Sequence, residues 1–291
     1  MKKILSRLVG SPKVQIPQFV PPGHYYSPIP SPEEIRKDED RIFGKPSRQV
    51  SGIEMNEKQQ VQLLQKFKEY YDGIPFESGK KPGLRYYFDN RMYSYSDAIF
   101  LYCMIRHLTP KNIIEVGSGF SSCVTLDTNE KYFDHSIKVT FIEPYPERLL
   151  SLLVPEDRER ITILPNRLQD VDLEVFDFLG ANDILFLDST HVSKVGSDVN
   201  RIFFEILPRL APGVHIHFHD IFYPFEYPKD WIYSGRAWNE AYLLKAFLQY
   251  NHSFRIVLMN TYLHRYHQDF FNSNMPLCLK NTGASIWIKK T

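Results

Sequence analysis

The sequence predicts an α/β fold with a mostly parallel, seven-stranded sheet that is flanked by helices. Two observations support this fold class. From about residue 90 onward, short apolar segments alternate with segments of helical periodicity, as in strands joined by crossover helices. The first of these segments also runs straight into a glycine-containing turn, Gly117-Ser118-Gly119, that precedes a predicted helix. The last two apolar segments indicate an antiparallel pair that closes the sheet.

The predicted elements follow from apolar patterning and from residues that start or stop helices. Ser96 can cap the free N–H groups of one helix, which Pro110 ends because the residue before a proline disfavours helix. Further helices are predicted at 56–71, from Ser121, and at 146–153, 198–210 and 238–250. Strands are predicted at 112–116, 138–142, 161–164, 183–187, 214–218, 254–259 and 284–288.

The first fifty residues differ in composition from the rest of the chain. Their prolines argue against regular helix or central strand, whereas apolar residues such as Phe19 offer anchors for packing. We therefore expect an extended Pro-rich arm, with Tyr25 and Tyr26 covering the site and contacting substrate. Residues 1–85 form the first predicted domain, an arm with a helical extension, and residues 86–291 form the second. The prolines occupy positions 12, 17, 21, 22, 28, 30, 32 and 46.

Charge and cysteine content argue against several classes of protein. Lysine and arginine total 35 against 34 acidic residues, so no net field favours nucleic acid or an anionic membrane. Three widely spaced cysteines suit a reducing compartment. The first residues resemble a signal peptide, but Arg7 interrupts the apolar run, and no run reaches the ~20 residues of a membrane span. We expect a soluble, cytoplasmic protein. The sequence is compatible with a homo-oligomer.

Glu115 indicates which nucleotide the glycine turn binds. It stands just before Gly117, where a dinucleotide would place its pyrophosphate. A carboxylate there repels phosphate but attracts a cation, such as the ammonium of S-adenosylmethionine (SAM). Ser122 also replaces the third glycine of a dinucleotide-binding motif. The turn therefore favours SAM over NAD.

The rest of the cofactor site is predicted from the ends of the other strands. Glu143 ends the second predicted strand, where its carboxylate can accept hydrogen bonds from both ribose hydroxyls. Glycines at 117 and 119 let the backbone approach the nucleoside closely. Tyr145, Gln169 and Asp170 are candidates for contact with adenine. The predicted cofactor-binding residues are Glu115, Gly117, Ser118, Gly119, Ser121, Ser122, Glu143, Gln169, Asp170 and Asp188.

The motif Glu115-x-Gly117-x-Gly119, followed by Glu143 and a seven-stranded pattern, resembles the class I SAM-dependent methyltransferases. Residues 186–191 and 212–220 are similar to a bacterial branch that includes metal-dependent, macrocin-type sugar O-methyltransferases. The resemblance covers the chain from about residue 90 to its end. It implies a Rossmann-like strand order of 3-2-1-4-5-7-6 and O-methylation of a hydroxyl on a sugar, a glycan or a small natural product.

The same resemblance implies a reaction centre at the ends of the fourth and fifth strands. Asp188 and the pair His219-Asp220 are the implied ligands of a divalent metal, and His191 is the implied general base. His219 stands where a carboxylate is expected, which favours Mn²⁺, Fe²⁺ or Zn²⁺ over Mg²⁺. A metal-free site, in which His191 or His219 alone deprotonates the acceptor, stays open. The predicted catalytic residues are Asp188, His191 and His219.

Two further features bear on the site. His215, His217 and His219 alternate along one strand face, too far apart for one ion, so we expect His215 and His217 to be buried and to bond neighbouring backbone. The aromatic loop after the fifth strand should select the acceptor, and Trp231 and Arg236 are predicted to contact it.

Other functions are compatible with the same residues. N-methylation of an amino sugar needs a base but no metal. A non-catalytic SAM-binding protein needs neither. A metal-dependent hydrolase built on the histidine strand leaves Glu115 and Glu143 unexplained.

Overall fold

The computed structural model describes residues 18–291. These form two compact units, residues 18–44 and residues 45–291. The signal-like start and the first two prolines of the arm lie outside the described residues. The predicted domain boundary near residue 85 stays a prediction. Helix α3 (Glu57–Tyr71), which was assigned to the arm, packs against helix α4 (Tyr95–Leu108) in the second unit.

The first unit contains two short helices, α1 (Pro32–Lys37) and α2 (Glu39–Phe43). The expectation that prolines exclude helix throughout this segment is therefore wrong. Pro32 occupies the first turn of α1, where a helix has no intrahelical partner for the missing N–H group. Ser31 caps the same end by accepting a hydrogen bond from the N–H group of Glu34.

The second unit is built on one seven-stranded sheet with the order β3-β2-β1-β4-β5-β7-β6, which confirms the predicted topology. Strands β1 to β5 run parallel, and β7 pairs antiparallel with both β5 and β6. The strands are β1 (Asn112–Val116), β2 (Lys138–Ile142), β3 (Ile161–Leu164), β4 (Ile184–Leu187), β5 (His215–His219), β6 (Phe254–Met259) and β7 (Ser285–Lys290).

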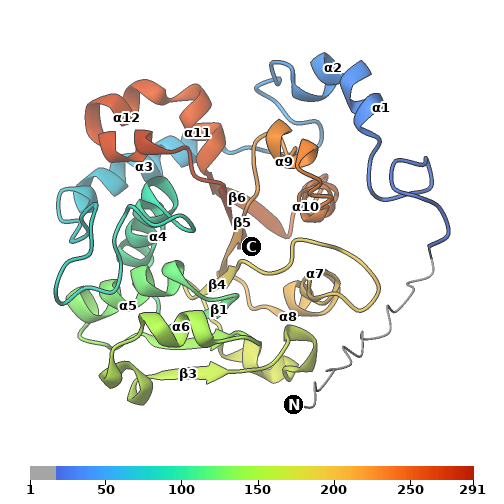
Figure 1. Ribbon diagram of the computed structural model, residues 1–291. Coiled ribbons are helices and arrows are strands. Elements are labelled where there is room, and N and C mark those ends of the chain that lie inside the picture. Colours follow the sequence, from blue (N-terminus) through green and yellow to red (C-terminus); the bar gives the residue numbers. More distant parts are fainter. Residues whose placement is uncertain (1–17) are drawn as a thin grey trace, which may run out of the picture. The chain divides into compact units, whose positions relative to one another are not determined.

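Helices cover both faces of this sheet (Figure 1). On one face lie α4, α5 (Phe120–Phe133) and α6 (Glu147–Leu152). On the other lie α10 (Glu240–Leu248) and a helical segment made of α7 (Asp198–Arg201), the π-helical turn η4 (Ile202–Ile206) and α8 (Leu207–Arg209). Strands β4 and β5 are buried along their whole length, as expected for central strands covered on both sides.

Several helical segments were not predicted from the sequence. Helix α9 (Lys229–Tyr233) interrupts the aromatic loop after β5. The connection between β6 and β7 holds α11 (Asn260–Tyr266) and α12 (Gln268–Asn274), so this antiparallel pair is not a simple hairpin. Shorter 3₁₀ turns are η1 (Pro155–Glu159), η2 (Leu168–Asp170), η3 (Leu173–Phe178) and η5 (Pro276–Lys280). Within residues 18–291, no helix has the length and apolar character that crossing a bilayer requires.

A buried ion-pair network joins the loop before α4 to α5 and η1. The guanidinium of Arg85 donates to Asp127 at 2.7 Å and to Asp157 at 2.6 and 2.7 Å, and all three side chains are buried. The carboxylate of Asp127 also accepts from the backbone N–H groups of Arg85 and Tyr86. Because both carboxylates are withdrawn from water, their charges depend on this one guanidinium.

We expect Arg85→Met to lower the free energy of unfolding by about 3–5 kcal/mol, because it leaves two buried carboxylates without a cation. The exposed pair Arg209–Asp177 supplies a matched control, since Arg209→Met should cost only about 0–1 kcal/mol. Urea unfolding of both variants measures the difference. Equal losses would show that burial does not govern the strength of the Arg85 network.

Candidate functional site

The glycine turn lies where β1 comes closest to the end of β4. Gly117 has a φ of +79°, and a Cβ at this position would lie 1.8 Å from the backbone oxygen of Asp188. The N–H group of Asp188 in turn donates to the oxygen of Val116 at 2.9 Å. Gly117 is therefore required by the chain's own packing. Gly119 is extended, and a Cβ there would touch only the Arg148 side chain at 3.5 Å.

Glu115 is fully buried beneath this turn. Its Oε1 accepts hydrogen bonds from Ser121 at 2.6 Å and from Ser122 at 2.8 Å, whereas its Oε2 has no partner. Burial raises the pKa of Glu115 to about 8, although the two serine hydroxyls oppose this shift. At this pKa, Glu115 carries a proton at neutral pH when only protein groups surround it, and it is not part of the wall of the cavity described below. Its contact with the ammonium group of SAM stays a prediction. Ser122 also accepts from the N–H group of Gly119, so it holds the turn.

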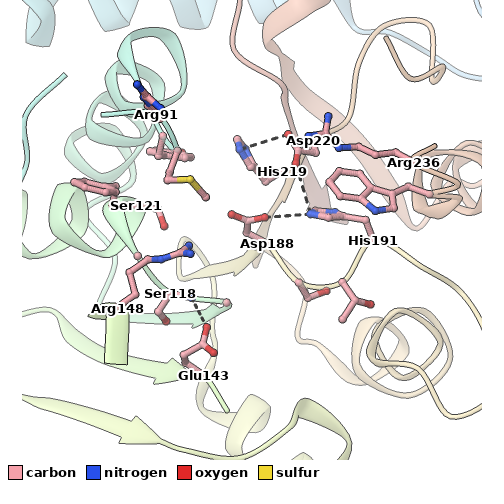
Figure 2. Close-up of a pocket in the computed structure, with 18 of the residues that line it drawn as sticks. Arg91, Ser118, Ser121, Glu143, Arg148, Asp188, His191, His219, Asp220 and Arg236 are labelled. Carbon is pink, nitrogen blue, oxygen red and sulfur yellow. Dashed lines mark hydrogen bonds and ion pairs between the residues drawn. The ribbon is translucent and has the colours of Figure 1, made fainter. Parts of the chain in front are cut away.

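Glu143 follows β2 and faces the same turn. Its Oε2 accepts from the N–H group of Ser118 at 3.0 Å, and its Oε1 accepts from the N–H group of Tyr145 at 2.9 Å. Figure 2 shows this carboxylate beside Ser118. Because each oxygen keeps a second lone pair, the carboxylate can still accept hydrogen bonds from the two hydroxyls of a ribose.

The predicted adenine contacts lie in other surroundings. Gln169 donates its side-chain N–H to the oxygen of Gly196 at 3.0 Å, and Asp170 forms a double hydrogen bond with Arg167. Neither residue is part of the wall of the cavity described below, and Tyr145 is exposed. Contact between these three residues and adenine stays a prediction.

Asp188, His191 and Asp220 meet at the carboxyl ends of β4 and β5. The Nε2 of His191 lies 3.2 Å from Oδ1 of Asp188 and 3.6 Å from Oδ2 of Asp220. One ligand atom from each of the three lies within 4.8 Å of the others. This grouping is the one expected when parallel strands end at the same edge of a sheet.

Glu240, which the sequence reasoning missed, holds His191 from the far side. Its Oε2 lies 2.9 Å from Nδ1 of His191, and both side chains are buried. The N–H groups of Asn239 and Glu240, at the start of α10, also donate to the backbone oxygen of His191. The ring of Trp238 packs against the imidazole of His191, with the two ring centres 4.4 Å apart. No local pattern in the sequence joins Glu240 to His191, because 49 positions separate them.

The carboxylates around His191 hold a proton on it. Burial lowers the pKa of this imidazole, but the hydrogen bonds to Asp188 and Glu240 outweigh burial and raise the pKa to about 10. His191 is consequently cationic at neutral pH when only protein groups surround it. A metal ion or an acceptor that replaces this proton must compete with both carboxylates.

The three histidines of β5 differ in their surroundings. His219 lines the cavity, and its Nε2 lies 3.6 Å from Oδ1 of Asp220. Its roles as a metal ligand and as a general base stay predictions. His215 and His217 are buried, and burial lowers the pKa of both. The expectation that His217 bonds backbone is wrong. Neither of its ring nitrogens has a partner, because the ring stacks on Phe186 at 4.0 Å.

One cavity of about 470 Å³ joins these groups (Figure 2). The glycine turn, Glu143 and Arg148 form one half of its wall, and Asp188 stands between that half and His191. The remaining wall residues that matter below are Arg91, His219, Asp220, Trp231, Arg236 and Trp238. Trp231 and Arg236, predicted as acceptor contacts, thus lie in the same cavity as the cofactor residues. Tyr25 and Tyr26 belong to the first unit, where their rings pack at 4.2 Å, and their substrate role stays a prediction.

Comparisons with known proteins agree with this geometry. The sequence model of a family described as a methyltransferase domain matches residues 114–221. An uncharacterized protein of Archaeoglobus fulgidus is 34% identical over 175 residues, which cover 58% of this chain and 78% of that protein. Because the match spans most of the archaeal protein, the chain belongs to its family.

Solved structures with the same general architecture are also methyltransferases. The SAH-bound methyltransferase PaMTH1 of Podospora anserina is 12% identical, with a TM-score of 0.47 over 95% of this chain and all of that one. The SAM complex of the O-methyltransferase TomG of Streptomyces achromogenes is 14% identical, with a TM-score of 0.45 over 82% of this chain and 92% of that one. At these scores, neither likeness carries the assignment.

The family match, the strand order and the site together define a class I SAM-dependent methyltransferase. The chain is an enzyme of that class, and SAM is its methyl donor.

Gly117→Ala should lower the free energy of unfolding by on the order of 3 kcal/mol and weaken SAM binding, because the new Cβ meets the Asp188 carbonyl. Gly196 is the matched control. It also has a positive φ, of +68°, but a Cβ there would have nothing within 4 Å. We expect Gly196→Ala to cost only about 1 kcal/mol. Thermal unfolding with and without SAM measures the stability and the SAM binding of both variants. Similar losses of stability would show that the positive φ, and not the contact with Asp188, accounts for the cost at Gly117.

Glu240→Gln should lower the pKa of His191 by about one unit or more, because it removes one carboxylate from the ring. Histidine NMR titration of the protein without ligands reads this change directly. The pKa of His191 is higher in the folded protein than in the unfolded chain. The stabilisation that Glu240 provides by binding protonated His191 is therefore greatest below about pH 6.5 and is lost as pH approaches 10. A stability difference between wild type and variant that grows with pH would contradict the assignment.

Proposed function

We propose that this enzyme transfers the methyl group of SAM to a hydroxyl group on a sugar, a glycan or a small natural product. One observation carries the proposal: Asp188 and His191 line the same cavity as the glycine turn and Glu143. A group that can accept a proton therefore lines the same cavity as the predicted cofactor residues. Proximity of this kind is what methyl transfer to a weakly acidic hydroxyl requires.

His191 is the residue that takes the acceptor's proton. SAM, when bound, supplies a methyl group on a positively charged sulfur. Nε2 of His191 faces the cavity and receives the hydroxyl proton, while Glu240 at Nδ1 fixes the orientation of the ring. Only the neutral imidazole can accept this proton. The raised pKa therefore makes the reaction faster at higher pH, until His191 is deprotonated near pH 10.

Asp188, His191 and Asp220 also fit a divalent cation. Two carboxylates and one imidazole suit Mn²⁺, Fe²⁺ or Zn²⁺, and Glu240 at Nδ1 is the kind of partner that orients a histidine ligand. Such a cation would lower the pKa of a bound hydroxyl. His191 would then serve as a ligand, since its Nε2 lone pair cannot bind metal and proton at once. In that case the proton would pass to another group, and His219 is the other imidazole on the wall of this cavity.

Glu143→Gln should weaken SAM binding by about tenfold to a hundredfold, because a neutral amide accepts more weakly from the ribose hydroxyls. Glu147→Gln, on the exposed start of α6, is the matched control and should bind SAM as the wild type does. Calorimetric titration with SAM measures all three proteins. Unchanged affinity in Glu143→Gln would remove this carboxylate from the cofactor site.

His191→Asn and Asp188→Asn should each reduce methyl transfer by about 10²–10⁴-fold while the protein still binds SAM. The measurement is formation of S-adenosylhomocysteine (SAH) with a panel of sugars that carry free hydroxyl or amino groups. His252→Asn, at an exposed position remote from the cavity wall, is the control. Transfer only to amino sugars would favour N-methylation, and SAM binding without any SAH would favour a non-catalytic protein.

The same assay separates the two roles of His191. If His191 is the base, SAH formation rises about tenfold per pH unit between pH 7 and 9 and is unaffected by a chelator. If His191 is a metal ligand, a chelator abolishes the activity and Mn²⁺ restores it.

A further inference from the structure

Three arginines line the cavity, namely Arg91, Arg148 and Arg236. All three residues are exposed, and elsewhere in residues 45–291 some arginines, such as Arg48, Arg85 and Arg209, form ion pairs with carboxylates whereas others, such as Arg158, form none. Within that part of the chain, no carboxylate forms an ion pair with any of the three cavity arginines. A guanidinium in a cavity wall without an internal counter-ion is available to an anionic ligand.

Arg148 and Arg236 lie in opposite halves of the site. Arg148 lies on the cofactor side, where its Cδ is 3.5 Å from the position of a Cβ on Gly119, and Figure 2 shows it beside Ser118 and Glu143. Arg236 lies on the opposite side, next to His191 and Asp220 (Figure 2). The carboxylate of SAM therefore has a cation of its own near the glycine turn. Arg236 is left for the molecule that receives the methyl group.

The aromatic loop holds Arg236 in place. The guanidinium carbon lies 4.2 Å from the ring centre of Trp231 and 5.5 Å from that of Trp238. The N–H group of Arg236 also donates to the backbone oxygen of Trp231 at 3.1 Å, which closes the turn after α9. Stacking of this kind orders a guanidinium before a ligand arrives, and it reduces the entropy that binding would otherwise cost.

The same contacts show what the two indole rings do. Trp231 packs against Arg236, and Trp238 packs against the imidazole of His191. One face of each ring is thus occupied by a side chain of this protein. The rings serve to position a cation and an imidazole, in addition to any surface that they offer to a sugar. The charge of Arg236 is therefore available to recognise the acceptor, whereas each indole ring has only one face left for stacking on it.

We propose that the acceptor carries a carboxylate near the hydroxyl that is methylated, and that Arg236 binds this carboxylate through two parallel N–H···O hydrogen bonds. The substrate class is then a hydroxy acid, such as a uronic acid or a residue of an acidic glycan. This inference rests on the proposed function, because it places the acceptor hydroxyl beside His191. Asp220 stands near this guanidinium and repels any anion, but it repels a doubly charged phosphate about twice as strongly as a singly charged carboxylate.

Binding to the SAH-saturated protein tests the proposal without requiring turnover. D-glucuronate, D-glucose and glucose 6-phosphate are titrated separately, and tryptophan fluorescence reports occupancy because Arg236 lies on Trp231. We expect the wild type to bind glucuronate at least about tenfold more tightly than glucose or glucose 6-phosphate. Equal affinities for glucuronate and glucose, or no saturable binding of glucuronate, would overturn the proposal. Preference for the phosphate would overturn the choice of carboxylate.

Three variants assign the preference to the Arg236 side chain. Arg236→Gln should lose the preference for glucuronate, and Arg236→Lys should keep part of it, since lysine retains the charge but not the planar fork. Both should keep the affinity of the wild type for SAH. Arg158→Gln, at an exposed position outside the cavity wall, is the control and should behave as the wild type does. Preference retained in Arg236→Gln would exclude this side chain.

Failure of this inference can be distinguished from failure of the proposed function. If SAH forms with neutral sugars as readily as with uronic acids, the hydroxyl-directed methyl transfer stands and the carboxylate requirement falls. If no hydroxyl acceptor yields SAH although glucuronate binds through Arg236, the proposed reaction falls and the anion site remains.

Discussion

The contact between Gly117 and the backbone oxygen of Asp188 is the constraint on which the site depends. It brings the end of β1 and the end of β4 so close that no side chain fits between them. One consequence is that the glycine turn is open to a cofactor. The other is that the Asp188 side chain emerges beside that turn, so the predicted donor site and the reacting groups share one cavity. A substitution at Gly117 would therefore disturb both halves at once.

Neighbouring elements of the fold fix the orientation of His191 and raise its pKa. Helix α10 holds its backbone oxygen through two N–H groups and its Nδ1 through Glu240. Asp188 and Asp220 face its Nε2, so the ring stands among three carboxylates and its pKa rises to about 10. The same negative surroundings that favour a proton also favour a metal ion. Competition between these two occupants is what the chemistry of this site must decide.

The sequence predicted the strands because periodicity and alternation are local signals, and the resemblance to the class I methyltransferases implied their order. Sequence reasoning failed where the signal was weak or long-range. Two proline-flanked helices, α1 and α2, were missed because a proline that breaks a helix interior is tolerated in a first turn. Helices α11 and α12 were missed because the residues between the two closing strands were left unassigned. Gln169 and Asp170 bond Gly196 and Arg167, and their contact with adenine stays a prediction.

The sequence by itself determined the class of cofactor and the edge of the sheet where the proposed reaction centre lies. Glu115, the two glycines and Glu143 stand at the ends of short apolar strands, and parallel strands always bring such ends together. Only the tertiary structure decided the partners of the reacting groups. Glu240 and Trp238 meet His191 because the start of helix α10 packs against the segment that follows β4. Contacts of this kind arise from packing across many residues, and no local pattern encodes them.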